Sequence, residues 1–471
     1  MNPSGIPGLD ELIGGLPKGE LVIIAGGPGT GKTMFSASFL YWGAVKYGEK
    51  GLYISFAEDH ETFIRNMKRV GYDFEELENR GFFRFIDALT VMEAGMAELL
   101  KMIIEEASLF RAQRLVIDSL SALVQGMKEP RELRVFLHTL LSRIMRGLGC
   151  TTILIEEVPV GETRIGYGFE EFVASAVILL EKDMIDNRFI RRMKIEKLRG
   201  LPIRSKIACY TLGAGFIAFP PYKPPVLENP KTPDPIPDPP GRYSSGLKDL
   251  DEALGGYPKG STILLEIDAR VTRDQYRMLI WPHSANFLRN KRPIITIPGI
   301  GSSPKDLEAF YESYALPEDE RKLARHFLAV EAVNKFSPRN IITYDPKDGI
   351  DSLIEKIESS ADELMKEVGS PPLIVVSMDS LEFNYELEDV LKIVSRIAAW
   401  TRRNNALSLL ADKSSYPKLT RKISSIASIH LKLTRRHGCL LLYGIKPMIP
   451  LHAVKVETER GCYETRLIPI T

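Results

Sequence analysis

Residues 26–33 have the residue types and spacing that point most clearly to a specific chemistry. They follow the apolar run Leu21–Ala25 and read Gly26, Gly27, Pro28, Gly29, Thr30, Gly31, Lys32 and Thr33. The glycines let the backbone turn its N–H groups inward around an anion, which a Cβ would crowd. The lysine can bind the β- and γ-phosphates, and the last threonine can offer its hydroxyl to Mg²⁺. We therefore predict a Walker A loop that binds ATP, followed by a helix whose positive end faces the phosphates.

A Mg-ATP site also needs an acidic residue at the end of a buried strand, to hold the metal through its water. The apolar run Leu115–Ile117 ends in Asp118, so we predict that Asp118 and Thr33 form the metal side of the site. An aspartate that only caps the next helix is the alternative.

Hydrolysis further requires a group that orients or deprotonates the attacking water, and carboxylates at the ends of neighbouring strands are the candidates. Glu58, directly after the run Leu52–Phe56, is our first choice, with Asp59, Glu156 and Glu157 as alternatives. A purely structural carboxylate at a helix start would also explain Glu58.

Apolar strand-like runs alternate with helical patterns through the first half of the chain. The expected strands are Leu21–Ala25, Leu52–Phe56, Phe82–Ile86, Leu115–Ile117 and Thr151–Ile155, and the expected helices are Lys32–Tyr47, Glu61–Val70, Val91–Phe110 and Arg131–Leu148. This alternation predicts an α/β fold with a mostly parallel central sheet flanked by helices. Two further runs, Ala174–Leu180 and Phe189–Leu198, flank Asp186-Asn187 and predict an antiparallel hairpin.

The sequence also repeats itself. The segment Ser4–Gly19 returns as Ser245–Gly260 at a constant offset of 241 residues, which indicates a duplicated domain. Between the copies, Pro220–Pro240 holds ten prolines and few large apolar residues. We predict an extended linker at 220–241 between domains at 1–219 and 242–471, with a proline-rich ligand for a partner as the alternative.

The second copy has lost the phosphate loop. By the repeat offset, Gly26–Thr33 falls on Ile267–Asp274, where no glycine remains and Lys32 and Thr33 become Arg273 and Asp274. Such a loop cannot wrap its amides around a phosphate, so we expect one nucleotide per chain. Arg273 is expected to pair internally, with Asp268 and Asp274 nearby. Asp379-Ser380 matches Asp118-Ser119, which predicts a retained fold.

Composition excludes several classes of protein. Lys and Arg number 62 against 61 Asp and Glu, so no overall charge recruits nucleic acid or an anionic membrane. No apolar run approaches the ~20 residues of a membrane span, and we expect a cytoplasmic protein. The four cysteines and seven histidines show neither a disulfide framework nor metal-ligand spacing.

In order along the chain, a set of motifs resembles the RecA-like ATPase domain of the KaiC family. The motifs are Ser4–Leu12, the loop 26–33, Gly51–Glu58, Asp118-Ser119, Gly168–Val173 and Lys197–Gly200. The resemblance covers residues 4–220, and the second half resembles a divergent copy of the same domain, as in double-domain KaiC-like proteins. A clock-type autokinase is disfavoured, because it would need an intact second site.

The resemblance implies further roles. Two adjacent glutamates follow the second strand in that family, and here they fall on Ala57 and Glu58, so only one is kept. The Lys and Arg of the last motif act in that family on the γ-phosphate of a neighbouring subunit, which implies that Lys197 and Arg199 act in trans in a hexameric ring. The alternatives are that the basic residues 188–199 form a solvated hairpin face or a strip for nucleic acid.

Three functions remain open from the sequence. The first is a KaiC-like ATPase that works as an oligomeric, nucleotide-dependent switch. The second is a RecA-like motor for DNA recombination or unwinding, for which Val158–Tyr167, with Arg164 and Tyr167, is the candidate DNA segment. The third is a regulator that binds ATP without hydrolysing it, which the loss of a glutamate at Ala57 favours.

Overall fold

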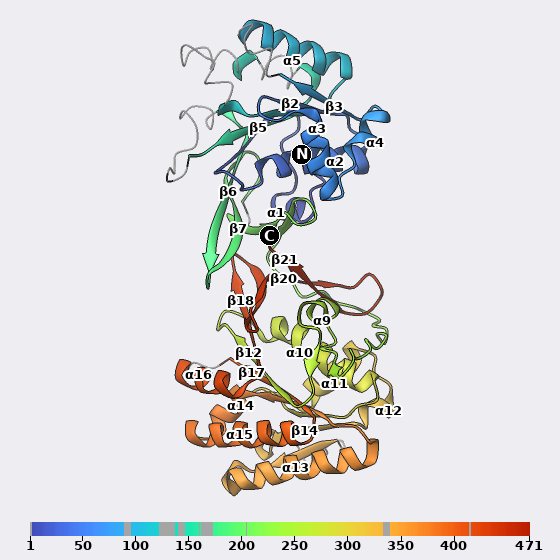
Figure 1. Cartoon of the computed structure of the whole chain (residues 1–471), viewed down its shortest axis with the longest axis vertical. Helices are drawn as coiled ribbons and strands as arrows, with labels where there is room; N and C mark the ends of the chain where they lie inside the picture. The colour runs from blue at the N-terminus through green and yellow to red at the C-terminus, as the bar shows by residue number, and fades with distance from the viewer. Residues whose placement is uncertain are drawn as a thin grey trace. The chain divides into compact units, whose positions relative to one another are not determined.

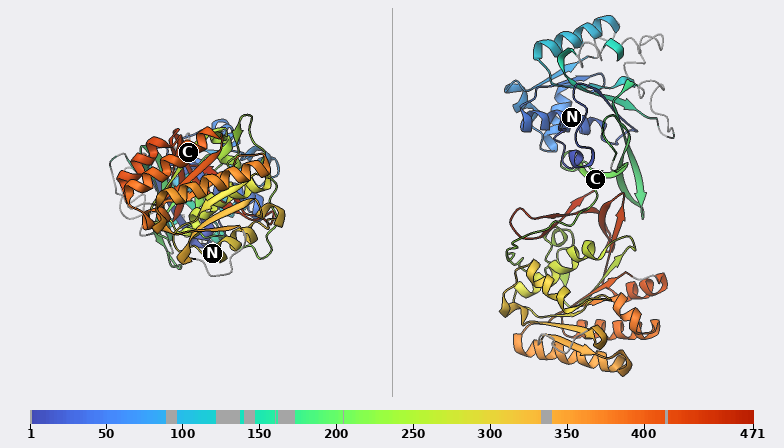
Figure 2. Two further views of the ribbon diagram at one scale, coloured as in Figure 1. Left: turned by 90° about the horizontal axis from the view of Figure 1, so that it is seen from below. Right: turned by 180° about the vertical axis from the view of Figure 1, so that it is seen from behind.

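The computed structural model describes residues 2–88, 96–121, 137–139, 147–159, 161, 173–203, 205–332, 340–413 and 416–471. The chain divides into two compact units. The first comprises residues 1–221, 437–439 and 469–471, and the second comprises residues 222–436 and 440–468. Each unit is built on one large sheet with helices packed on its faces (Figure 1, Figure 2).

The first unit has a nine-stranded sheet in the order β3-β2-β4-β5-β1-β6-β7-β8-β9. Its strands are β1 (Leu21–Gly26), β2 (Gly51–Ser55), β3 (Phe83–Asp87), β4 (Arg114–Asp118), β5 (Thr151–Glu157), β6 (Ala176–Ile185), β7 (Arg188–Leu198), β8 (Ile207–Thr211) and β9 (Ile217–Phe219). Strands β1 to β6 run parallel, whereas β7, β8 and β9 continue the sheet in antiparallel fashion. The mostly parallel sheet and the hairpin at Asp186-Asn187 are thus confirmed.

Helices cover both faces of this sheet. They are α1 (Leu9–Ile13), α2 (Lys32–Tyr47), α3 (His60–Arg69), α4 (Phe74–Asn79) and α5 (Met96–Phe110). Val22 and Ile24 of β1 pack into the core under α2, α3 and α4, while Leu21, Ile23 and Ala25 pack into the core under α5. Because both faces of β1 are buried, the strand is apolar throughout rather than alternating. The expected helix Arg131–Leu148 lies largely outside the described residues.

The second unit has a ten-stranded sheet in the order β15-β14-β13-β16-β17-β12-β18-β19-β20-β21. Its strands are β12 (Ser261–Ile267), β13 (Ile294–Ile297), β14 (Ala324–Ala329), β15 (Ile341–Tyr344), β16 (Leu373–Ser377), β17 (Leu407–Asp412), β18 (Ile429–Arg436), β19 (Cys439–Lys446), β20 (Ile449–Glu457) and β21 (Glu464–Pro469), with a small separate pair β10 (Arg242–Tyr243) and β11 (Tyr257–Pro258). Apart from the added edge strand β15, the strand order repeats that of the first sheet. The topology therefore agrees with the duplication in the sequence.

The helices of the second unit again form two layers. They are α9 (Lys248–Leu254), α10 (Arg273–Arg289), α11 (Pro304–Ser313), α12 (Glu318–Arg321), α13 (Gly349–Val368), α14 (Met378–Asn384), α15 (Leu387–Arg403) and α16 (Pro417–Ile426), with short 3₁₀ turns at Val330–Ala332 and Pro346–Asp348. Helices α10 and α11 share one core, and α13 to α16 share the other. None of the described helices is long and apolar enough to span a bilayer.

The proline-rich segment lies on the second unit. Residues 222–241, all of which the structure describes, form no helix or strand. The Ile236 N–H donates to Asn286 Oδ1 at 2.8 Å, and Asp238 accepts both terminal nitrogens of the buried Arg292, at 2.6 and 3.0 Å. An Arg–carboxylate pair of this bidentate kind fixes orientation as well as position. The segment is therefore tied to the second unit along its length.

Candidate functional site

The loop between β1 and α2 has the geometry of an anion cradle. Gly29 and Gly31 adopt left-handed φ values of 66° and 94°, which L side chains rarely tolerate. A Cβ at Gly26 would lie 2.6 Å from both Leu180 O and Thr30 Oγ1, so only glycine fits there. Gly31 is the N-cap of α2, and no side chain caps the helix. The first amides of α2 therefore point to an anion rather than to the chain itself.

Side chains of β6, β7 and β8 donate hydrogen bonds to the backbone carbonyls of this loop. Lys182 Nζ donates to Pro28 O at 3.0 Å, and Arg191 Nη1 donates to Gly29 O at 2.9 Å. Tyr210 OH donates to Thr30 O at 2.6 Å. We did not predict these contacts from the sequence, because they depend on the β6–β7 register, in which Lys182 faces Arg191. Two cations thus lie at the loop, each bound to one of its carbonyl oxygens.

Thr33 and Asp118, the two residues predicted to hold a metal, contact each other. Thr33 Oγ1 donates to Asp118 Oδ2 at 3.1 Å, and the Tyr53 hydroxyl donates to the same oxygen at 2.5 Å. Burial raises the pKa of Asp118, while these two hydrogen bonds act to lower it. Lys32 Nζ donates to Gly27 O at 3.0 Å, and burial lowers the pKa of Lys32. Tyr53 is a further site residue that the sequence analysis missed.

These residues fit magnesium bound together with a nucleotide. Mg²⁺ keeps several waters and takes one or two protein oxygens plus phosphate oxygens, rather than a cage of side chains. Thr33 and Asp118 supply that number. The described residues contain no group of three or more His, Cys, Asp or Glu side chains that could hold a metal alone.

Glu58 is fixed in a tight turn beside this site. Ser55 Oγ accepts from the Glu58 N–H at 2.9 Å and donates to Glu58 O at 2.7 Å. The Glu58 carboxylate accepts from Asn66 Nδ2 at 2.7 Å. Burial raises the pKa of Glu58, with a further rise from the charge of Asp118, while the Asn66 bond lowers it. A half-buried carboxylate with a raised pKa is suited to accept a proton.

The alternative carboxylates differ in what they contact. Asp59 is exposed and caps α3 by accepting from the Thr62 N–H at 2.9 Å, which is a structural role. Glu156 is buried at the end of β5, level with Ala25. Glu157 is level with Gly26 at the exposed end of β5, and its charge raises the pKa of Lys32. Glu157 is thus the alternative carboxylate nearest to the phosphate-binding lysine.

Lys197 and Arg199 lie away from the loop of their own chain. Lys197 pairs with Val177, which is level with Ile23, and the Arg199 N–H bonds to Ser175 O beside Leu21. At about 3.3 Å per strand residue, they lie roughly 10 and 16 Å before the end of β1 along the strand direction. The structure therefore does not bring them to the Walker A loop within one chain. Gly168–Phe172, Arg164 and Tyr167 lie outside the described residues.

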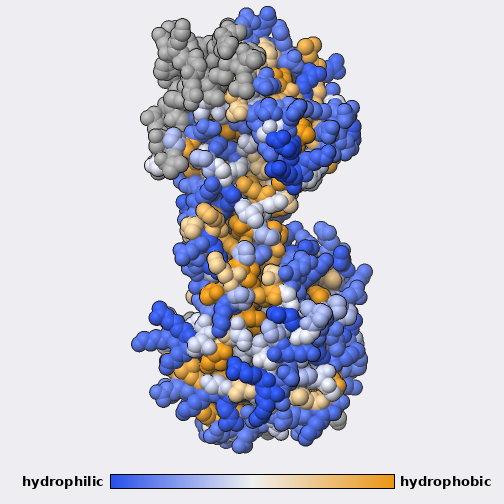
Figure 3. Space-filling view, viewed as in Figure 1, coloured by the Kyte–Doolittle hydropathy of each residue, from blue (hydrophilic) through white to orange (hydrophobic). Residues whose placement is uncertain are grey.

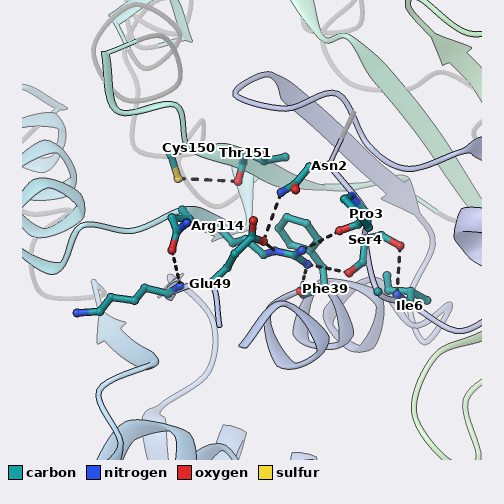
Figure 4. Close-up of polar contacts among 12 residues, drawn as sticks. Asn2, Pro3, Ser4, Ile6, Phe39, Glu49, Arg114, Cys150 and Thr151 are labelled. Carbon is teal, nitrogen blue, oxygen red and sulfur yellow. Dashed lines mark hydrogen bonds and ion pairs between the residues drawn. The ribbon is translucent and has the colours of Figure 1, made fainter. Parts of the chain in front are cut away.

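A buried arginine connects the strand of Asp118 to the helix that follows the loop (Figure 4). The Arg114 side chain is fully buried and pairs with Glu49 at 2.5 Å. Its guanidinium also donates to the carbonyls of Pro3, Ser4 and Phe39 at 2.6–2.7 Å. A Cβ at Gly43 of α2 would lie 2.4 Å from Arg114 Nε, so glycine in mid-helix makes room for this side chain.

The corresponding loop of the second unit is closed. A capping box lies at the start of α10, in which Gln275 Oε1 accepts from the Thr272 N–H at 3.0 Å, so two backbone donors at this helix end are satisfied from within the chain. Asp268 is bound by Arg270 at 2.7 Å and by Thr434 at 3.0 Å. These contacts agree with the loss of the phosphate cradle that the sequence predicts.

Our prediction for Arg273 was wrong in its partners. Asp268 pairs with Arg270, and Asp274 lies 3.4 Å from Arg277. The Arg273 guanidinium instead donates to the carbonyl of Ile300. It also lies close enough to Asp379 to lower the pKa of that carboxyl, against the larger raising effect of burial. The cause is the helical spacing, because Asp274 lies one turn before Arg277 on the same helix face.

Strand register corrects the match of Asp379 with Asp118. In the first sheet, Asp118 of β4 and Ile24 of β1 lie level with the same position of β5, the strand between them. In the second sheet, Ser377 of β16 and Leu265 of β12 lie level with the same position of β17. Leu265 is the repeat counterpart of Ile24. Ser377 therefore occupies the place of Asp118. Asp379 follows two residues later inside α14, so the identical Asp-Ser pairs do not occupy equivalent positions in the two sheets.

A mostly parallel sheet, a glycine cradle ahead of an uncapped helix, and a Thr–Asp pair define a RecA-type P-loop ATPase domain. The family model described as "ATPase: KaiC" matches residues 2–222, and the model described as "GvpD basic region 2" matches residues 232–471. The chain belongs to the KaiC-like family of RecA-superfamily P-loop ATPases, with a GvpD-like second region.

Individual relatives match the first half of the chain. A UPF0273 protein of Pyrococcus horikoshii is 35% identical over 213 residues, which are 42% of this chain and 84% of the relative. A UPF0273 protein of Thermotoga maritima is 35% identical over 217 residues, which are 42% of this chain and 86% of the relative. The crystal structure of a KaiC-like protein from Pyrococcus horikoshii is 36% identical, with a TM-score of 0.42, and covers 46% of this chain and 98% of that protein.

Proposed function

We propose that this chain is an oligomeric ATP-dependent switch of the cytoplasm, whose first unit binds and hydrolyses Mg-ATP and whose second unit binds no nucleotide. The observation that carries the proposal is the open N-terminus of α2 beside the Thr33–Asp118 contact of 3.1 Å. The helix N-terminus without a side-chain cap, the glycine-rich loop and the Thr33–Asp118 pair all favour the binding of one polyanionic ligand.

In the proposed reaction, Lys32 and the loop amides bind the phosphates, and Glu58 accepts a proton from the attacking water. Bound magnesium would neutralise charge on the β- and γ-phosphates, held by Thr33 and Asp118. Lys197 and Arg199 of a neighbouring copy would complete the site, since their strand positions keep them from the loop of their own chain. Turnover would then depend on assembly, for which we propose a hexameric ring.

A second candidate is an ATP-gated regulator that does not hydrolyse ATP. It is favoured by Ala57, an exposed alanine where the family has a second glutamate, and by the Asn66 bond that holds Glu58. The two candidates differ in one measurement, because only the first releases phosphate with time.

The test is ATP turnover, with and without single-stranded DNA, alongside particle mass with ATP and with ADP. We expect turnover that falls as the chain is diluted below its assembly concentration. Lys32→Ala should abolish ATP binding, whereas Lys101→Ala, at an exposed position on α5, should not. ATP affinity within a few-fold of the unmodified chain in Lys32→Ala would refute the Walker A assignment.

Calorimetric titration with a non-hydrolysable ATP analogue tests whether the second unit binds nucleotide. We expect one nucleotide per chain, because the loop before α10 has no glycine and the capping box of Thr272 and Gln275 satisfies two donors at the helix start. A stoichiometry near two, or one that survives Lys32→Ala, would show that the second unit binds nucleotide.

A further inference from the structure

The second unit carries a strongly basic segment that ATP chemistry does not explain. Residues 413–456 contain nine Lys and Arg and no Asp or Glu. At the average composition of the chain, a segment of this length would hold about six carboxylates. The overall charge of +1 therefore hides a local concentration of cations.

The folded chain gathers several of these cations on one side of the sheet. Helix α16 buries Leu419 and Ile423 in the core, and its outer face exposes Lys418, Arg421 and Lys422. These three positions are spaced i, i+3 and i+4, so their side chains share one face of the helix. Figure 1 shows α16 at the rim of the second unit, and Figure 3 shows a hydrophilic surface over that region.

Two further cations extend this surface. Lys413 follows β17, just before α16, and its charge lowers the pKa of Asp379. Arg436 ends β18 and is exposed. Since α16 contacts the even-numbered side of β18 through the Ser424–His430 bond of 2.9 Å, Arg436 projects from the same side of the sheet as α16. We call Lys413, Lys418, Arg421, Lys422 and Arg436 the α16 basic face.

The cations on α16 are not neutralised by the protein. Within the described parts of the chain, no carboxylate pairs with Lys418, Arg421 or Lys422, whereas Glu266 pairs with Lys432 and His430 deeper on this side. By contrast, the exposed Lys392 on α15 pairs with Asp389 at 2.9 Å. Like charges at i and i+4 destabilise a helix by about 0.2–0.5 kcal/mol per pair, and a cation in the first turn opposes the helix dipole. The fold itself gains nothing from this arrangement.

An exposed aromatic ring adjoins the cations. Tyr416 is the N-cap of α16, and 51% of its surface is exposed. A row of cations beside an aromatic ring is the combination that binds single-stranded nucleic acid, because cations bind the phosphates and bases stack on the ring. We propose that the α16 basic face binds single-stranded DNA or RNA. This inference goes beyond the proposed ATPase function and concerns a different unit of the chain.

The test uses the full chain and the fluorescence anisotropy of a labelled ~30-nucleotide single strand of mixed sequence, as DNA and as RNA. The test variant replaces Lys418, Arg421 and Lys422 by serine. The matched control replaces three other exposed helix cations of the same unit, Lys366, Lys392 and Arg396. We expect the test variant to weaken binding about tenfold or more and to reduce the salt-dependence slope by about 2, and the control to bind normally.

Tyr416→Ala separates nucleic acid from other polyanions. It should weaken binding of single strands several-fold, Tyr416→Phe should retain binding, and a duplex of the same sequence should bind less tightly. Binding should persist in Lys32→Ala, so that this inference and the ATPase proposal can fail independently. The inference is overturned if no single strand binds at low salt or if the test variant binds like its control. It is equally overturned if poly-glutamate competes as well as DNA and Tyr416→Ala has no effect, which would indicate an acidic protein partner.

Discussion

Replacing Arg114 by methionine should destabilise the first unit by about 3–5 kcal/mol, the range for removing one partner of a buried ion pair. The Arg114 side chain is fully buried and that of Glu49 is 14% exposed, so the change leaves Glu49 and three backbone carbonyls without their cation. Methionine keeps the apolar stem, which limits the loss to the charge and its hydrogen bonds. For a unit of about 220 residues the melting temperature should fall by roughly 10 °C.

Scanning calorimetry measures this shift, and the transition of the first unit is the one that Mg-ATP raises. The control is Arg84→Met, because the Arg84–Glu106 pair at 2.8 Å is 45% and 33% exposed and should contribute only about 0–1 kcal/mol.

A second experiment uses Gly43 of α2, which lies beside Arg114. Gly43→Ala should be destabilising beside Arg114, but in an Arg114→Ala background it should stabilise by up to about 1 kcal/mol, because the Arg114 Cδ, Nε and Cζ atoms that an added Cβ would meet at 2.4–2.7 Å are then gone. Equal effects in the two backgrounds, or equal losses from Arg114→Met and Arg84→Met, would refute this account.

Three further predictions concern the proposed reaction. Glu58→Gln should keep ATP binding and lose most turnover in a phosphate-release assay, because an amide can position water but cannot accept its proton; if turnover survives, Glu157 becomes the preferred base. Asn66→Ala should move the acidic limb of the pH–rate profile to higher pH, since Asn66 lowers the raised pKa of Glu58; an unmoved limb would exclude Glu58 as the titrating base. Arg199→Ala should lower turnover. Mixing it with Glu58→Gln chains should restore some activity, because a mixed interface unites an intact Glu58 with an intact Arg199. If activity does not recover in assemblies shown to exchange subunits, action in trans is contradicted.

The raised pKa of Glu58 also has a consequence for stability. Because its pKa in the folded chain lies above the ordinary value of 4.5, the folded state binds this proton more tightly than the unfolded state. The contribution of Glu58 to the free energy of unfolding is therefore larger at low pH and declines as pH rises from 4.5 through the raised folded pKa. Activity needs the ionised form, so stability and turnover respond to this group in opposite directions.

Much of the fold could be predicted from local sequence, because its signals are local. The helix Lys32–Tyr47 has the bounds expected from the loop before it and Gly48 after it, and the Asp186-Asn187 turn gave the hairpin. What could not be predicted depends on register. The contact of Lys182 with the loop follows from strand pairing, and the shift from Asp379 to Ser377 follows from the register of β16 against β17. The shared Asp-Ser sequence was a weaker guide to the residue equivalent to Asp118 than position in the sheet.

The two units differ most at the start of one equivalent helix, and this difference bears on the proposed switch. In the first unit Gly31 leaves the amides of α2 open, so binding a phosphate adds stability there, about 2.7 kcal/mol when the ligand is at a hundred times its Kd. In the second unit the capping box of Thr272 and Gln275 satisfies two donors at the helix start from within the chain, with an N-cap contribution of about 0.5–2 kcal/mol at every nucleotide concentration. Under the proposed function, the stability of the first unit therefore changes with ATP and that of the second stays constant. A duplicated chain with this asymmetry can respond to nucleotide in its first half while its second half keeps one fixed surface available to a partner.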